Sequence, residues 1–373
     1  MEVKTSPERD AIAFAERVLT LLDQGTFVAT YKYAVMLALI DLCLEGTGRA
    51  GAAPDMVTTR QLAEKVLYLY WPHTVPYQKG SGEQILRQNS GRQARILTDI
   101  IEFRGRLSDP SMPLQRVRRE EPEDIKKLIR EIEWTLIHMP LPRLQVIGQE
   151  EHRFIYEIHW DASIERKRKI VTEYQRTGSG PFDNRILLKP GVGDYLVMLN
   201  SLLRPLIQRK WTAMITRFNR MDESELEDFL FGSERIPLNT VKPALMELQD
   251  GRCFYCGREM TAAEVDHFIP WARYPDNGIE NLVLADSCCN RDKRDFLAAT
   301  EHVLRWADRN RHGSQSAEAL KHFAHHTGWE THPSETLGAT RAIYFRLSEQ
   351  ATLWKIKKEF VVPHRPSLIE ALS

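Results

Sequence analysis

The sequence predicts an α+β fold that is mostly α-helical, with a helical N-terminal domain and a smaller C-terminal domain. The longer segments repeat their apolar residues at helical spacing, as residues 12–22 do. Segments that alternate like strands are few and short. Four of the five cysteines lie within residues 251–295. These observations divide the chain into an accessory or recognition domain, residues 1–240, and a second domain, residues 241–373, whose core is 251–300.

The composition is that of a globular protein without a dominant charge. Apolar residues make up 42% of the chain, and 51 basic side chains balance 51 acidic ones. A net charge of zero creates no overall field, so any contact with a polyanion has to come from local patches. No run of apolar residues is long enough for a membrane span, and the first residues do not resemble a signal peptide. Five cysteines, four of them clustered, indicate a cytoplasmic protein with a metal site rather than disulfides.

Helical periodicity defines five segments before residue 140, namely 7–24, 28–44, 58–71, 90–107 and 120–139. The second segment is apolar nearly all round, which predicts a buried core helix. Thr58 and Gln61 have the spacing of a helix-capping pair. The helix that they open resembles one helix of a helix-turn-helix unit, or is a plain core helix. Residues 143–160 alternate around Gly148 like a small two-stranded β hairpin.

A basic stretch without acidic residues lies between Asp194 and Asp222. Its basic side chains are interleaved with aromatic ones, and those that we expect to contact nucleic acid are Arg209, Lys210 and Arg217. Such a stretch is typical of a face that contacts a phosphate backbone. An amphipathic helix whose long basic stems cover its solvent side gives the same pattern. The sequence leaves both interpretations open.

The cysteines of the second domain are spaced like ligands of a tetrahedral zinc ion. Cys253 and Cys256 form one half of such a site, and Cys289 supplies a further thiolate. A second pair of the same spacing needs a cysteine at position 286, where Asp286 stands. Zinc also accepts a carboxylate, so Asp286 is one candidate for the fourth ligand. Alternatively Cys288 takes that place in a strained geometry, or the cysteines bind no metal and only pack.

Between the two halves of this cysteine pattern lie two predicted strands, one around His267 and one at residues 282–284, and Cys289 begins a helix. Four short motifs stand in this segment: Cys253–Cys256, Asp266-His267-Phe-Ile-Pro270, Asn281-Leu282-Val283-Leu284 and Cys289-Asn290-Arg-Asp-Lys293. Their order and spacing resemble the HNH endonuclease family with its ββα-metal core. The resemblance covers about residues 251–295. One position departs from the family name, because Asn290 stands where its last letter denotes a histidine.

The resemblance implies a role for each motif. His267 is expected to be the general base, and Asn281 to orient it by a hydrogen bond. Asp266 and Asn290 are expected to hold one divalent cation, Mg²⁺ or Mn²⁺. Neighbouring phosphates are expected to be bound by Lys293, Arg273 and Arg291.

The implied function is metal-dependent hydrolysis of DNA phosphodiester bonds. A large accessory domain on such a core fits a bacterial restriction-like or anti-phage defence role. The neutral net charge favours a homodimer or a partner protein that brings the chain to DNA. The alternative is a non-catalytic zinc-containing module that binds nucleic acid within a complex.

Overall fold

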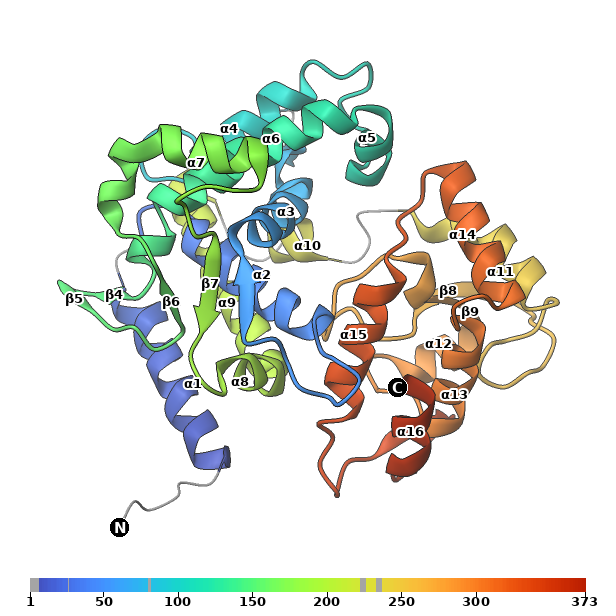
Figure 1. Ribbon diagram of the computed structural model, residues 1–373. Helices are drawn as coiled ribbons and strands as arrows, with labels where there is room; N and C mark the ends of the chain where they lie inside the picture. The colour runs from blue at the N-terminus through green and yellow to red at the C-terminus, as the bar shows by residue number, and fades with distance from the viewer. Residues whose placement is uncertain (1–6, 26, 80–81, 222–225, 233–236) are drawn as a thin grey trace, which may run out of the picture. The chain divides into compact units, whose positions relative to one another are not determined.

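The computed structural model describes residues 7–25, 27–79, 82–221, 226–232 and 237–373 (Figure 1). The predicted α+β, mostly helical fold is confirmed, because helices dominate and the strands are short. The chain forms two compact units. Unit 1 comprises Met1–Cys43 and Pro54–Gly232, and unit 2 comprises Leu44–Ala53 and Ser233–Ser373. The division lies at residue 232, eight positions before the expected one at 240, and residues 44–53 are grouped with the C-terminal unit.

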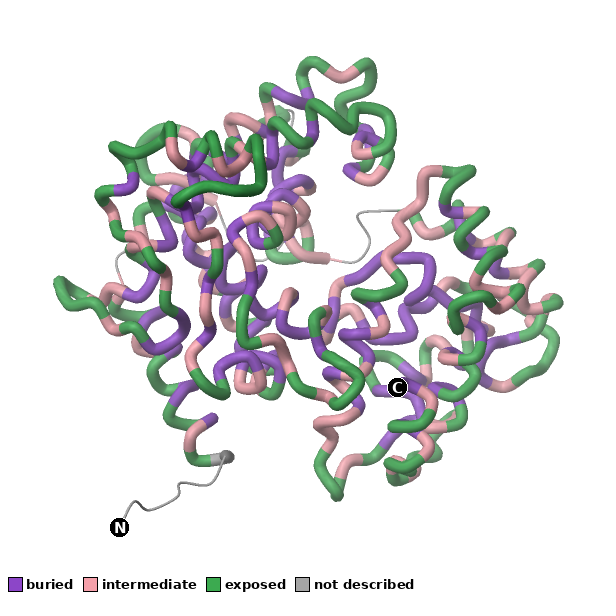
Figure 2. The backbone as a smooth tube through the Cα atoms, in the orientation of Figure 1, coloured by how far each residue is buried: buried purple, intermediate pink, exposed green. Residues whose placement is uncertain are grey.

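Unit 1 is built mainly from helices. Their bounds are α1 Pro7–Gln24, α2 Tyr31–Glu45, α3 Thr59–Tyr70, α4 Arg95–Arg104, α5 Leu114–Glu120, α6 Pro122–His138, α7 Arg168–Thr177, α8 Val192–Met198, α9 Asn200–Asn219 and α10 Leu226–Phe231. The expected core helix is α2, which is buried along nearly its whole length (Figure 2). The expected cap of α3 is also present, since Thr58 and Gln61 form reciprocal hydrogen bonds.

The strands of unit 1 differ from the single expected hairpin. β4 (Val146–Ile147) and β5 (Glu150–Glu151) do form a tight hairpin. β6 (Tyr156–Ile158), however, pairs with β7 (Arg185–Leu188), which also pairs with β1 (Met56–Thr58). The reason lies in a buried side chain, because Gln145 accepts from the backbone N–H of Ile155 and donates to the carbonyl of Tyr156. A further antiparallel pair, β2 (Tyr77–Lys79) with β3 (Gly82–Gln84), completes the strands described in this unit.

Unit 2 places a β hairpin and a short helix among further helices. The helices are α11 Lys242–Leu248, α12 Ser287–Lys293, α13 Thr300–Arg309, α14 Gln315–Thr327, α15 Pro333–Tyr344 and α16 Arg365–Leu372. The hairpin consists of β8 (Ala263–His267) and β9 (Leu282–Asp286), in a register that runs from Ala263 opposite Asp286 to His267 opposite Leu282. The expected strand–strand–helix order of this segment is confirmed.

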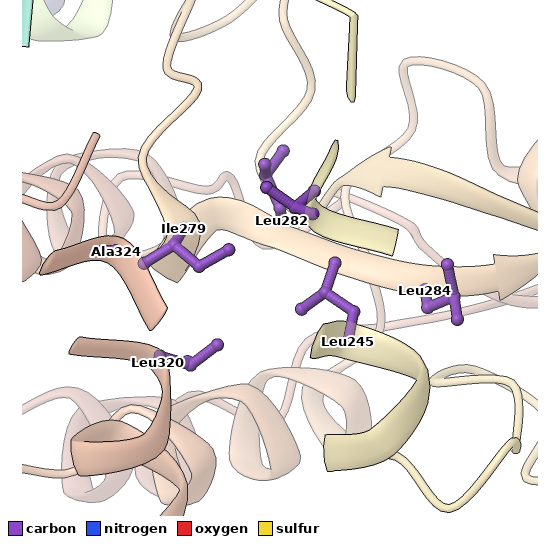
Figure 3. Close-up of a cluster of buried hydrophobic side chains, with 7 residues drawn as sticks. Leu245, Ile279, Leu282, Leu284, Leu320 and Ala324 are labelled. Atoms are coloured by element: carbon purple, nitrogen blue, oxygen red, sulfur yellow. The ribbon is translucent and has the colours of Figure 1, made fainter. Parts of the chain in front are cut away.

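One face of this hairpin packs on an apolar cluster. Leu282 and Leu284 of β9 form a buried apolar cluster with Leu245 of α11, and Leu320 of α14 and Ile279 also belong to it (Figure 3). Directly opposite residues of an antiparallel pair lie on the same face, so Val265 joins this apolar side. Glu264 and Asp266, which alternate with it, are thereby directed to the opposite face, on which α12 packs.

The C-terminal part of unit 2 contains a second hairpin. α15 ends at Tyr344, and a hairpin of β10 (Leu353–Ile356) and β11 (Glu359–Val361) follows. Trp354 ties this hairpin to the segment after α12. Its ring is buried, and its backbone hydrogen-bonds to Leu297 and Ala299. Within the described ranges, no helix is long and apolar enough to cross a membrane.

Candidate functional site

Three of the cysteines converge at one end of the β8–β9 hairpin. The Sγ atoms of Cys253, Cys256 and Cys289 lie within 4.8 Å of one another. Zn–S bonds of about 2.3 Å place two sulfurs of a tetrahedral site about 3.8 Å apart, so this spacing fits a shared zinc ion. The turn between the first two is tight, because Gly257 donates to the carbonyl of Cys253 with a φ of 69°. Burial and the neighbouring thiols raise the pKa of Cys289, because a thiolate there would be desolvated and repelled by the other two sulfurs. A bound cation would relieve that repulsion.

Asp286 lies outside this group of three and has another task. One carboxylate oxygen accepts from the N–H of Cys288 at 3.1 Å and caps α12. The other oxygen accepts from the N–H of Thr261 at 3.0 Å. Cys288 is exposed and also lies outside the group. In the part of the chain that the structure describes, neither expected candidate for the fourth zinc ligand therefore joins the three thiols.

Asp266 lies in β8, and only one of its two carboxylate oxygens is bound by neighbouring side chains. Its Oδ2 atom is 2.9 Å from Nζ of Lys293 and accepts a hydrogen bond from the hydroxyl of Tyr255. Among the described residues, nothing donates a hydrogen bond to Oδ1. The residue is 9% exposed, so Oδ1 is the oxygen that remains for a ligand.

Lys293 is buried, whereas the sequence led us to expect an accessible side chain. We expected it to bind a phosphate, but its side chain is 0% exposed. Its ammonium group binds the Asp266 carboxylate and donates to the carbonyl of His267 at 2.8 Å. A fully buried ammonium with these partners does not reach a polyanion. Lys293 instead ties α12 to β8 and balances the charge of Asp266.

His267 ends β8 with its ring mostly buried. Its Nε2 atom lies 2.8 Å from Oδ1 of Asn277, so Nε2 carries the proton and Nδ1 keeps its lone pair. Nδ1 has no hydrogen-bond partner within the described ranges. The ring contacts Trp271 with 5.2 Å between the centroids. Burial is the main cause that lowers the pKa of His267 below its usual value, which keeps the imidazole neutral near pH 7.

Asn281 acts on the loop between the strands. Its buried side chain accepts from the N–H of Ile269 at 2.8 Å and donates to the carbonyls of Ile269 and Asp276. The expectation of a direct bond to His267 is therefore not met. Asn281 instead closes the loop that carries Asn277, which is the residue that binds the imidazole. Asn277 was not expected at the site, because Asp276-Asn277-Gly278 has the composition of an ordinary loop.

The same loop is fixed by a buried ion pair. Asp276 lies 2.5 Å from Nε2 of His332 and accepts hydrogen bonds from the N–H of Gly278 and the hydroxyl of Thr336. Burial alone would raise the pKa of Asp276, but the charge and hydrogen bond of His332 outweigh it and the pKa is lowered. The two residues that flank Asn277 are therefore fixed, because Asp276 binds His332 and Thr336 and accepts from the N–H of Gly278.

Asn290 lies on α12, half-buried, opposite the strand that carries Asp266. Its Nδ2 donates to Oε2 of Glu264 at 2.8 Å. No described residue donates to its Oδ1 atom. An amide oxygen and a carboxylate oxygen are thus left without partners on facing elements, and such hard oxygen ligands fit Mg²⁺ or Mn²⁺. Glu264, two positions before Asp266 on the same strand face, is a further carboxylate that sequence analysis did not single out.

The other expected nucleic-acid contacts divide into two groups. Arg291 is exposed, and Arg273 is half-buried with partners of its own. On α9, Arg209 and Arg217 are exposed, whereas Lys210 pairs with Asp23 at 2.6 Å. The aromatic residues of this helix, Trp211 and Phe218, are buried. The interpretation of α9 as an amphipathic helix with basic stems toward solvent therefore fits the structure.

Comparison with known proteins agrees with this site. Residues 253–299 match the HNH endonuclease family, so unit 2 contains a nuclease domain of the HNH type. Residues 12–230 match a second family, described as a domain of unknown function, DUF8808. That match extends over more than half of the chain, and the chain belongs to the DUF8808 family. No curated protein and no solved structure matches the chain.

Proposed function

We propose that the chain is a metal-dependent HNH endonuclease that hydrolyses phosphodiester bonds of DNA. The observation that supports the proposal is the hydrogen bonding of three side chains, each of which keeps one atom without a partner. Nδ1 of His267, Oδ1 of Asp266 and Oδ1 of Asn290 lack hydrogen-bond partners among the described residues, while the other polar atom of each side chain is bound. A general base and two oxygen ligands are thereby oriented by the protein interior.

The residues of the chain divide the reaction between them. Nδ1 of His267 takes a proton from the water whose oxygen attacks phosphorus, and the P–O3′ bond breaks. The leaving O3′ takes a proton from solvent and His267 returns its proton to solvent, which gives a 5′-phosphate and a 3′-hydroxyl. Asp266 and Asn290 would hold the divalent ion, which when bound neutralises phosphate charge and stabilises the leaving oxygen. Arg291, exposed on α12, is placed to bind a neighbouring phosphate.

The cysteines have a structural role in this proposal. Cys253, Cys256 and Cys289 would bind one zinc ion that joins the segment before β8 to α12. We assign Asp286 to the cap of α12 rather than to the fourth ligand position, because both its oxygens already accept backbone hydrogen bonds. Metal analysis of the purified chain should find about one zinc per chain.

The test is nicking of supercoiled plasmid with Mg²⁺ or Mn²⁺. The wild-type chain should convert plasmid to open circles, and His267→Ala should lose at least about 100-fold in rate because the general base is absent. His322→Ala, an exposed histidine on α14, serves as the matched control and should cleave normally. Equal nicking by wild type and His267→Ala would refute the proposal.

A second candidate is a non-catalytic module that binds nucleic acid within a complex. One observation favours it, namely that Lys293 already balances the charge of Asp266 without a metal. This candidate predicts DNA binding without cleavage in any divalent metal. Under the first proposal the large DUF8808 part fits a restriction-like or anti-phage defence role, with a homodimer or a partner protein delivering DNA.

A further inference from the structure

Tyr255 links the cysteine site to the aspartate of the candidate nuclease site. It lies between Cys253 and Cys256 in sequence, and its side chain is 3% exposed. Its hydroxyl donates a hydrogen bond to Oδ2 of Asp266. A carboxylate has no proton to give, so the tyrosine hydroxyl is the donor in this pair.

The position of this hydroxyl is set by packing rather than by Asp266. The ring of Tyr255 meets Trp354 and His302 edge-on, each with 5.2 Å between ring centroids. Arg305 of α13 hydrogen-bonds to the backbone carbonyl of Phe254 beside it. Elements that follow the family match, α13 and β10, therefore hold the ring together with the cysteine segment that carries it.

A hydrogen bond and an ion pair from different elements act on the same oxygen. Tyr255 donates to Oδ2 of Asp266 from the cysteine segment, and the Lys293 ammonium lies 2.9 Å from it on α12. A carboxylate held at one oxygen in both ways loses its freedom to rotate, which leaves Oδ1 as the oxygen available to a cation. Partners that orient a metal-binding carboxylate in this way affect metal affinity strongly.

We propose that Tyr255 is a positioning residue, which holds Asp266 through Oδ2 and so couples the cysteine site to the binding of the catalytic divalent ion. The inference rests on the proposed function. It assigns a task to a residue within the cysteine pair that carries no ligand atom. An ion bound by the cysteines would then order Tyr255, and through it Asp266.

The experiment measures Mn²⁺ affinity by electron paramagnetic resonance of the free ion, together with plasmid nicking. Tyr255→Phe removes only the hydroxyl and should weaken Mn²⁺ binding about 10-fold. Zinc content should stay at the wild-type value. Raising the Mn²⁺ concentration should restore most of the nicking rate, because the general base is intact. A purely structural role would not produce this dependence on Mn²⁺.

Two further variants of the chain make the result decisive. Tyr344→Phe is the control, since Tyr344 is also buried in unit 2 and donates one hydrogen bond, to the carbonyl of Ala298 at 3.0 Å. It should bind Mn²⁺ like the wild type. 4-Aminophenylalanine at position 255 restores a donor on the same ring and should recover the affinity. This third variant keeps the test decisive when Tyr255→Phe folds poorly.

The outcomes separate this inference from the proposed function. If the wild type nicks plasmid and Tyr255→Phe binds Mn²⁺ with unchanged affinity, the role of Tyr255 is refuted and the nuclease proposal stands. If Tyr344→Phe weakens Mn²⁺ binding as much, the effect is general and the inference also fails. A wild type that neither binds Mn²⁺ nor nicks plasmid overturns both.

Discussion

Nε2 of His267 lies 2.8 Å from Oδ1 of Asn277, ten positions further along the chain. The amide oxygen accepts a hydrogen bond but carries no charge, so it fixes the tautomer without favouring the imidazolium. Burial lowers the pKa of His267, which keeps the base neutral at a lower pH than a free histidine. The relationship predicts how the nicking rate depends on pH.

The first prediction concerns the acid side of the pH–rate profile. The unprotonated base should be present down to a pH below the usual histidine pKa of about 6.5, because burial opposes the charged form. The nicking rate should therefore fall only below that pH. Initial rates at saturating Mn²⁺ from pH 5 to 8 measure this. A fall that begins above pH 7 would contradict it.

Asn277→Asp should move this acid limb to higher pH. A carboxylate beside Nε2 stabilises the imidazolium, so the pKa of His267 should rise by about 1 to 2 units and more base should be protonated at pH 7. The rate at pH 6 should fall and recover at pH 8. Asn239→Asp, at an exposed position of unit 2, is the control for the same change of charge. An identical profile for Asn277→Asp and wild type would show that Asn277 does not act on the base.

Asn281→Ala tests the loop rather than the base. It leaves the buried N–H of Ile269 and two carbonyls without partners, and should lower the free energy of unfolding by about 3 kcal/mol. The pKa seen in the pH–rate profile of the remaining activity should stay near the wild-type value unless Asn277 moves. Urea unfolding with the same profile measures both effects. Unchanged stability would mean that the three hydrogen bonds do not close the loop.

The sequence predicted the order of β8, β9 and α12 because strand alternation is a local signal, although the cap of α12 by Asp286 was not expected. It also predicted the Thr58 cap of α3, which depends on residues three apart. The pairing of β6 with β7 was missed, since it joins segments separated by α7 and depends on packing. Burial of Lys293 was missed for a similar reason. Only the folded arrangement shows that Tyr255 and Asp266 surround its ammonium group.

Lys293→Met should separate charge balance from phosphate binding. The buried Asp266 carboxylate would lose its cation, which should cost about 3 to 5 kcal/mol of folding free energy. Added Mn²⁺ should raise the Tm of this variant more than that of the wild type, because the ion replaces the lost charge. Thermal unfolding with and without Mn²⁺ measures this, and equal shifts would argue against the charge-balancing role.

Arg291→Met is the matched surface variant. Arg291 is exposed on the same helix, so its stability should change by less than about 0.5 kcal/mol. Its binding to DNA should show a salt dependence reduced by about one phosphate contact. Lys293→Met should leave that slope unchanged. The opposite pattern in the two variants would return Lys293 to the phosphate-binding role expected from the sequence.

Substitutions at position 286 decide between the helix cap and the zinc ligand. Asparagine is as good a helix cap as aspartate but has a single acceptor oxygen, so Asp286→Asn should keep zinc and the cap while the N–H of Thr261 loses its partner. Asp286→Ala removes the acceptors for the N–H groups of both Cys288 and Thr261 and should cost about 1 to 2 kcal/mol, again without loss of zinc. Cys289→Ser should release zinc, whereas Cys288→Ser should retain it, because only the former belongs to the group of three thiols. Metal analysis beside urea unfolding distinguishes these cases. Loss of zinc from Asp286→Asn, with the cap intact, would identify the carboxylate as the fourth ligand and require Asp286 to leave the N–H groups that it binds here.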